Sequence, residues 1–91
     1  MNSSTTPDFW NSYADLPPEV KKRAKAVYRL WKENHRHPSL RLKKVGGVWA
    51  IRIGEGYRAL AILEHDTFYW FWIGPYDAYE MWLAGRKESV R

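Results

Sequence analysis

The sequence contains no cysteine and no long hydrophobic run. The absence of thiols excludes disulfides, thiolate metal sites and cysteine nucleophiles, and it is compatible with a cytoplasmic location. The longest apolar block, FYWFWI, has six residues, whereas a helix that spans a bilayer needs roughly 20. The opening stretch MNSSTTPDFW lacks the basic start and the apolar segment of a signal peptide. We therefore expect a soluble cytoplasmic protein without membrane contact.

Metal-binding side chains are scarce as well, since the chain has three histidines. His35 and His37 lie too close together in sequence to chelate an ion well without a third ligand, which the sequence does not supply. We therefore expect neither a metal nor a small-molecule cofactor.

Aromatic residues and positive charge are abundant. A chain of 91 residues predicts a single domain over residues 1–91, and the polar residues 1–6 predict a disordered tail. Its six tryptophans, six tyrosines and three phenylalanines supply the large side chains that the core of so small a domain needs. The formal net charge of +5 favours an anionic partner, nucleic acid first and an acidic protein second; plain solubility is the alternative.

Two helices are predicted near the N-terminus. Thr6 can cap a helix in which Pro7 is the first residue, and Pro17 and Pro18 separate it from a second helix over residues 19–34. Apolar residues recur at helical spacing along that second helix. The intervening cations form either a solvated face or an RNA contact; they are Lys21, Lys22, Arg23, Lys25, Arg29 and Lys32.

Short strands follow, and then a last helix. LRLKKV reads as an edge strand, VWAIRI and YRALAIL as a hairpin, and FYWFWI as a strand buried on both faces. YDAYEMWLAG predicts a short helix that ends before Gly85. The predicted fold class is α+β: a small antiparallel sheet of three to four strands, two N-terminal helices packed on one face, and a short C-terminal helix.

The hairpin raises an electrostatic question. A three-residue loop, Gly54-Glu55-Gly56, places Arg52 opposite Arg58 and leaves one face apolar, whereas a two-residue Glu55-Gly56 turn would push Arg58 into that face. We prefer the first register. It assigns these residues to the core face: Trp49, Ile51, Ile53, Tyr57, Ala59, Ala61 and Leu63.

Like charges directly opposite each other destabilise a sheet by up to roughly 1 kcal/mol unless an anion lies between them. Two sources of negative charge remain open. One is a bound phosphate, which the guanidinium fork suits well. The other is a carboxylate of the chain itself, from Glu55, Asp66, Asp77 or Glu80.

Three blocks of the chain together resemble the RelE/ParE-type toxins of type II toxin–antitoxin systems. They are the basic helix and loop LPPEVKKRAKAVYRLWKENHRHPSL, the hairpin VWAIRIGEGYRALAIL with its Tyr-Arg pair after the glycine turn, and the last strand and tyrosine-bearing end FWIGPYDAYEMWL. The resemblance implies a compact toxin with helices on one sheet face and a concave basic face opposite.

The resemblance also implies two alternative activities. RelE-like toxins enter the ribosomal A site, contact mRNA and 16S rRNA, and cleave the mRNA through attack of a 2′-hydroxyl on the adjacent phosphate. ParE-like toxins inhibit DNA gyrase instead. Both are held inactive by a cognate antitoxin, expected to be acidic and partly disordered. We expect a ribosome-dependent mRNA endonuclease that inhibits translation; a gyrase inhibitor or an atoxic member that only binds its antitoxin is the alternative.

The catalytic candidates follow from the same resemblance. Arg58 corresponds to the family's Tyr-Arg arginine, Arg52 to a basic position of the preceding strand, and Tyr79 lies near the C-terminal tyrosine; Tyr76 is a second tyrosine candidate. The chain departs from the family at Ala50, where RelE has a second strand lysine. It also departs at Pro75-Tyr76, where related toxins often carry His or Arg.

A general base is harder to assign. An ordinary tyrosine has a pKa near 10, so Tyr76 or Tyr79 needs help from cations, and each is alternatively an aromatic ring packed on the sheet. Imidazole is the side-chain group best suited to proton transfer near neutral pH, which makes His37 a further candidate, with loop packing before Pro38 as the alternative. The remaining RNA-binding candidates are expected to contact backbone phosphates without sequence preference; they are Arg41, Lys43 and Lys44.

Overall fold

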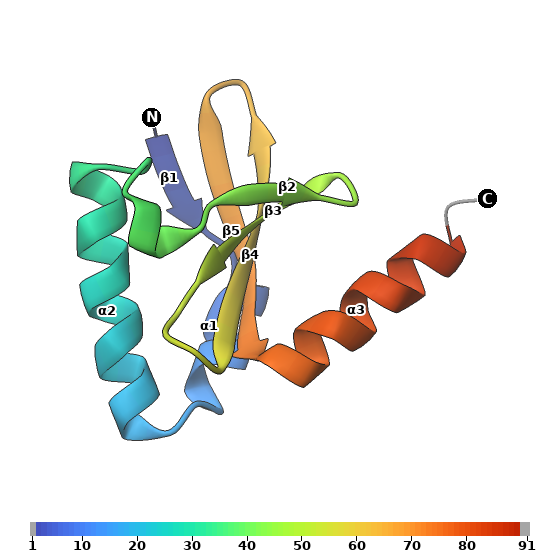
Figure 1. Ribbon diagram of the computed structural model, residues 1–91, viewed down its shortest axis with the longest axis horizontal. Helices are drawn as coiled ribbons and strands as arrows, with labels where there is room; N and C mark the ends of the chain where they lie inside the picture. The colour runs from blue at the N-terminus through green and yellow to red at the C-terminus, as the bar shows by residue number, and fades with distance from the viewer. Residues whose placement is uncertain (1, 90–91) are drawn as a thin grey trace.

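The computed structural model describes residues 2–89 and the side chains of residues 2–85. Over this range the chain forms a mixed sheet with helices on both faces (Figure 1). Its elements are β1 (Asn2–Thr5), α1 (Pro7–Ala14), α2 (Pro18–Glu33), the 3₁₀ helix η1 (Pro38–Leu40), β2 (Lys43–Val45), β3 (Val48–Arg52), β4 (Tyr57–Glu64), β5 (Thr67–Pro75) and α3 (Tyr76–Ser89).

The sheet corrects two predictions. Within the described residues it has five strands in the order β1-β5-β4-β3-β2, rather than three to four. Strand β1 pairs in parallel with β5, so Asn2–Thr5 is an edge strand and not part of a disordered tail. The polar sequence of β1 gave no strand signal, because its order comes from hydrogen bonds to the edge of β5, as from the Asn2 N–H to the Asp66 carbonyl.

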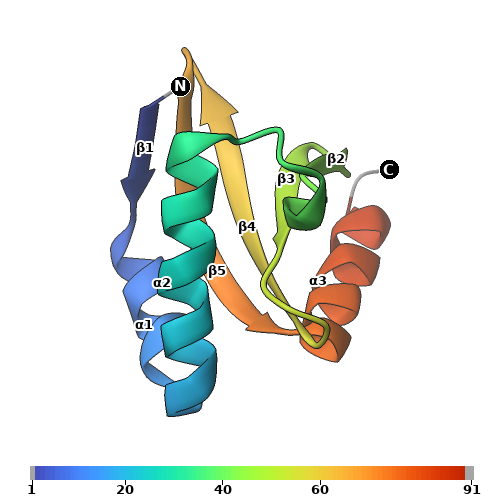
Figure 2. The ribbon, with the colours of Figure 1, turned by 60° about the vertical axis from the view of Figure 1, so that its left-hand side comes forward.

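The α+β class and the position of the first two helices are confirmed. Thr6 accepts a hydrogen bond from the Phe9 amide at 3.3 Å and caps α1, and Asn34 ends α2. Both helices lie on one side of the sheet, with α3 on the other (Figure 2). The main core lies between them and the sheet, and it contains Leu16, Val20, Ala24, Trp31, Leu40, Ile51, Ile53, Ala59, Ala61, Phe68, Trp70 and Ile73.

A smaller cluster occupies the opposite face, where the resemblance implied an open basic surface. Tyr79 of α3 packs there on Val48, Ala50 and Leu60, so α3 covers part of that face. A register shift between Leu60 and Ala61 leaves Phe71 without a partner on β4 and lets it join Trp72 at this cluster. Helix α3 also continues through Gly85, beyond its predicted end.

No helix among residues 2–89 is long and apolar enough to cross a bilayer.

Candidate functional site: a basic pocket beside the β3–β4 turn

The predicted register of the hairpin is confirmed. Arg52 lies opposite Arg58, and the Ile53 N–H donates to the Tyr57 carbonyl at 2.9 Å, which closes the three-residue loop. Because residues alternate along a strand, both arginines project to the face that carries Ala50 and Leu60, away from the main core.

A backbone oxygen lies between the two cations. The Gly54 carbonyl accepts from Arg52 Nε at 3.1 Å and from Arg58 Nη1 at 3.3 Å. Arg58 Nη1 also donates to the Tyr57 carbonyl at 2.8 Å. None of the hydrogen bonds of Arg52 and Arg58 within the described residues goes to a carboxylate, which was one of the two sources of negative charge left open. Arg52 keeps both Nη groups, and Arg58 keeps Nε and Nη2, without a protein partner in this range.

The start of α3 is tied to this turn. The Tyr76 N–H donates to the Gly56 carbonyl at 2.9 Å, and the Arg58 guanidinium lies 4.6 Å from the centre of the Tyr76 ring. The Tyr76 and Tyr79 rings are 5.5 Å apart at an angle of 45°. Arg58 is therefore held on one side by turn carbonyls and on the other by an aromatic ring, a cation–π contact that also limits its rotamers.

Both tyrosines hold their protons more tightly than a free tyrosine does. Hydrogen bonding to the Glu80 carboxylate, reinforced by its charge, raises the pKa of Tyr76 against the opposing effect of Arg58. Burial raises the pKa of Tyr79, which is 3% exposed and packs on the sheet as the alternative interpretation held. At neutral pH each phenol can donate a proton or a hydrogen bond, and neither is a ready base.

Lys43 lies directly across from Ala50 on the same face as the arginines. It lines a pocket of about 310 Å³ with Arg58, Ala50 and three residues beside them. We call this the arginine pocket; its lining residues are Arg41, Leu42, Lys43, Ala50, Ile51 and Arg58. Lys43 of the neighbouring strand therefore lies across from Ala50, the position at which the resemblance to RelE implies a second cation.

The other predicted RNA-binding residues lie in different places on the molecule. Arg41 lines the arginine pocket and also a second pocket of about 390 Å³, which we call the edge pocket. His37 lines the edge pocket and is not among the residues that line the arginine pocket with Arg58. Lys44 pairs with Trp49 and therefore projects from the opposite face to Lys43. The edge pocket is lined by His35, Arg36, His37, Pro38, Arg41, Leu42, Trp49, Leu63 and Phe68.

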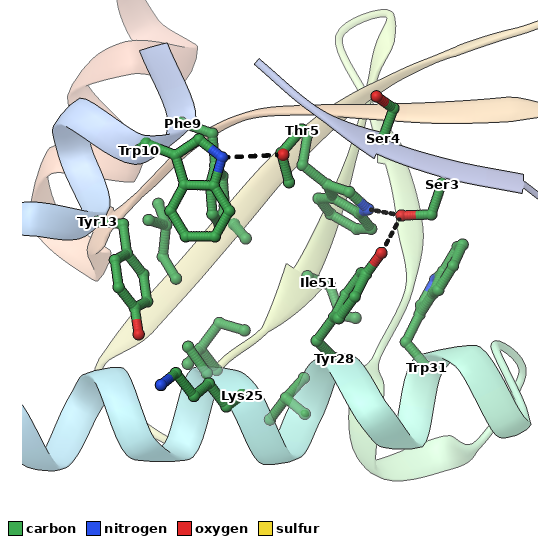
Figure 3. A pocket seen from close by; sticks show the side chains of 16 residues that line it. Ser3, Ser4, Thr5, Phe9, Trp10, Tyr13, Lys25, Tyr28, Trp31 and Ile51 are labelled. Carbon is green, nitrogen blue, oxygen red and sulfur yellow. Dashed lines mark hydrogen bonds between the residues drawn. The ribbon is translucent and has the colours of Figure 1, made fainter. Parts of the chain in front are cut away.

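A third cavity, of about 340 Å³, lies between α1, α2, β1 and the sheet (Figure 3). We call it the helix groove. It is lined mainly by apolar side chains, and Trp10 and Tyr28 at its mouth are 51% and 37% exposed. Hydrogen bonds to β1 fix both aromatic side chains at this opening. Trp10 Nε1 donates to Thr5 Oγ1 at 2.9 Å, and the Tyr28 hydroxyl lies 2.8 Å from Ser3 Oγ. No part of this groove was anticipated from the sequence.

Two further features of the site were not predicted from the sequence. The Gly54 carbonyl is a backbone group whose role appears only with the loop conformation, in which φ of Gly54 is 72°. Gly74 lies opposite Arg58, and the indole of Trp72 packs against it. A Cβ on Gly74 would lie 2.5 Å from that indole. The Lys43–Ala50 pairing had a signal, because a two-residue Gly46-Gly47 turn fixes that register.

Among the described side chains, those of residues 2–85, no group of three or more histidine and acidic residues is placed to hold a metal ion.

Solved structures share this fold. A chain of the RelB–RelE antitoxin–toxin complex from Methanococcus jannaschii aligns with a TM-score of 0.69 and 17% identity, over 86% of this chain and 95% of that one. The chain has the RelE/ParE toxin fold. A YoeB/ParE toxin from Agrobacterium tumefaciens aligns with a TM-score of 0.64 and 13% identity, over 84% of this chain and 99% of that one. A chain of the RelBE2 toxin–antitoxin complex from Mycobacterium tuberculosis aligns with a TM-score of 0.60 and 21% identity, over 81% of this chain and 88% of that one.

The sequence itself matches no protein-family model and none of the curated proteins. In the RelE/ParE fold of this chain, the arginine pocket lies where β2, β3 and β4 adjoin, and α3 flanks it.

Proposed function

We propose that the protein is the toxin of a type II toxin–antitoxin pair and that it cleaves mRNA on the ribosome. The observation that carries the proposal is the arginine pocket, which gathers Arg58, Lys43 and Arg41 over a small residue, Ala50. Unpartnered N–H groups of Arg58 are available for a phosphate oxygen. The fold shared with RelE toxins supports the assignment.

The chemistry available there is charge stabilisation. When a ribose 2′-oxygen attacks the adjacent phosphorus, an O2′–P bond forms and the P–O5′ bond breaks, and negative charge grows on the phosphoryl oxygens. Arg58 and Lys43 offset that charge, and a single preorganised donor can contribute about 3–4 kcal/mol to such a transition state. The protonated Tyr76 can donate to the leaving 5′-oxygen. The 2′-hydroxyl proton passes to solvent water, because the raised pKa of Tyr76 keeps its phenol protonated and unable to accept that proton.

One observation favours a second function. The pKa values of both tyrosines beside Arg58 are raised, so neither supplies the base that nucleolytic cleavage needs. A toxin that blocks its target by binding alone, as a gyrase inhibitor does, needs no base. A structure named as a YoeB/ParE toxin shares the fold.

Substitution of Arg58 by alanine, combined with primer extension, tests the function. Induced wild-type protein should stop growth and produce cuts in mRNA phased with ribosomal codons, and Arg58→Ala should lose both while circular dichroism shows an unchanged fold. Growth arrest with intact mRNA and a DNA-damage response would favour gyrase inhibition. Full toxicity of the variant would refute the role of Arg58.

The partner we propose is an acidic antitoxin whose amphipathic helix lies in the helix groove. The groove is apolar, and α2 beside it carries exposed cations, including Lys25 at the groove itself. Trp10→Ala should weaken antitoxin binding at least tenfold, because large aromatic anchors dominate such interfaces. Met81→Ala, on exposed α3, is the control. Equal affinities of the two variants would place the antitoxin elsewhere.

A further inference from the structure

The edge pocket combines two arginines and two histidines with an aromatic floor. His35, Arg36, His37 and Arg41 come from the segment between α2 and β2 and form its basic side. Trp49 and Phe68 come from the sheet. Cations around a flat apolar surface suit a ligand that carries both a phosphate and a heteroaromatic ring, that is, a nucleotide.

The basic side of the pocket is held by local hydrogen bonds. The Asn34 side chain accepts from the Arg36 amide at 3.1 Å, and the His37 amide donates to the Asn34 carbonyl at 3.0 Å. His37 Nδ1 accepts from the Ser39 amide at 3.2 Å, which caps η1. That bond assigns Nδ1 as an acceptor, so the neutral imidazole carries its proton on Nε2, where it can donate to a ligand.

The floor of the pocket is fixed by packing. Trp49 is half-buried, and its ring meets Phe68 edge-on with the centroids 5.8 Å apart. Phe68 is 1% exposed and stacks on Trp70 of the main core. A base that contacts Trp49 would therefore meet a rigid surface, and little side-chain entropy would be lost on binding.

Arg41 connects this pocket to the arginine pocket, since it is a lining residue of both. Its backbone is left-handed, with φ of 49°, at the point where η1 ends and the chain turns toward β2. No hydrogen bond of the Arg41 guanidinium to another described residue is observed, so the group can contact phosphates on either side. One nucleic-acid strand could therefore occupy both pockets, with Arg41 in contact with its backbone between them.

We propose that the edge pocket is a second RNA subsite, which binds the base and phosphate of a nucleotide next to the one held in the arginine pocket. The base contacts Trp49, and Arg36 and Arg41 bind the backbone. This inference rests on the proposed function for the identity of the ligand as RNA. It differs from that function in being a binding property that does not require cleavage.

The test measures binding of a short fluorescein-labelled oligoribonucleotide with 2′-O-methyl groups, which block cleavage, by fluorescence anisotropy. Trp49→Leu should weaken binding about 5- to 150-fold, the range for losing one base–aromatic stack, and Trp49→Phe should restore part of it. Because Trp49 also contacts the core, circular dichroism must show that each variant is folded.

Salt dependence separates the two contributions and does not depend on Trp49. Arg36→Gln should make the plot of log affinity against log salt shallower by about 0.7, the value for one phosphate contact to a single strand. Trp49→Leu should leave the slope unchanged. Lys22→Gln, on the exposed side of α2, is the charge-matched control and should change neither slope nor affinity.

The outcomes distinguish this inference from the proposed function. If Arg58→Ala abolishes cleavage while the Trp49 and Arg36 variants bind like wild type, the subsite is refuted and the proposed function stands. If wild-type protein does not bind the oligoribonucleotide, the subsite is refuted, whereas the proposed function, which requires the ribosome, is judged by primer extension alone. If the edge-pocket variants lose binding as expected while no cleavage occurs, the subsite stands without the nuclease.

Discussion

The two faces of β3 and β4 are built from alternating residues of the same strands, and they have different coverings. On one face Ile51, Ile53 and Ala59 are each 3% exposed and sealed beneath α1 and α2. On the other, a small apolar cluster beneath α3 gives way within two residues to Arg52 and Arg58. The first face stabilises the domain, and the second combines partial burial with cations that keep unpaired donors.

The largest expected effect compares two phenylalanines of β5. Phe68 is 1% exposed in the main core, and Phe71 is half-buried in the smaller cluster. Phe68→Ala should lower the free energy of unfolding by about 3–5 kcal/mol, because it removes a buried ring and leaves a cavity. Phe71→Ala should cost less, since a smaller area leaves water. Urea denaturation measures both changes in the free energy of unfolding. Equal changes would show that the two faces contribute equally to stability.

The next comparison concerns neighbouring lysines that point to opposite faces. Lys43→Ala should reduce the cleavage rate about 10- to 100-fold, because a hydrogen bond to a charged group is worth about 1.5–3 kcal/mol. Lys44→Ala is the matched control, since it pairs with Trp49 and projects away from the arginine pocket. Primer extension over a time course gives the rates. If the Lys44 variant is the slower one, Lys43 does not replace the cation missing at Ala50.

A third comparison sets the two glycines of the β3–β4 loop against each other. Gly54 has φ of 72°, and a Cβ there would lie 2.6 Å from Cδ of Arg23, whereas a Cβ at Gly56 meets nothing within 4 Å. Gly54→Ala should cost about 1–3 kcal/mol in strain and also displace the carbonyl that both arginines share. Gly56→Ala should be nearly neutral. Thermal unfolding distinguishes them, and a neutral Gly54→Ala would mean that the loop tolerates another conformation.

The smallest effect is the pH dependence of Tyr79 on the α3 face. Burial raises its pKa in the folded state, so the folded protein retains this proton above the ordinary pKa of about 10. The resulting stability is present below pH 10 and is lost as the pH rises through the raised pKa. Urea denaturation on both sides of that range should show a decline that Tyr79→Phe reduces. An identical decline in the variant would assign it to other groups.

Much of the hairpin could be predicted, because two local constraints agree there. A three-residue glycine loop fixes which residues lie opposite each other, and the burial of Ile51, Ile53 and Ala59 admits a single register. The arginine pair follows from these two facts alone. The short edge strand was placed, but its consequence for Lys43 was not drawn, although the two-residue turn at Gly46-Gly47 determines it.

The sequence by itself determined the cap of the first helix at Thr6, the break between the two helices at Pro17 and Pro18, and the side of the sheet on which Arg52 and Arg58 lie. It also determined the α+β class. These features depend on neighbours within one element or one turn. Only the tertiary structure decided what no local pattern specifies. It paired polar β1 with β5 more than sixty residues away, placed α3 over part of the face that carries the arginines, and joined two pockets at Arg41. Such contacts depend on which surfaces remain unpaired after the core has formed.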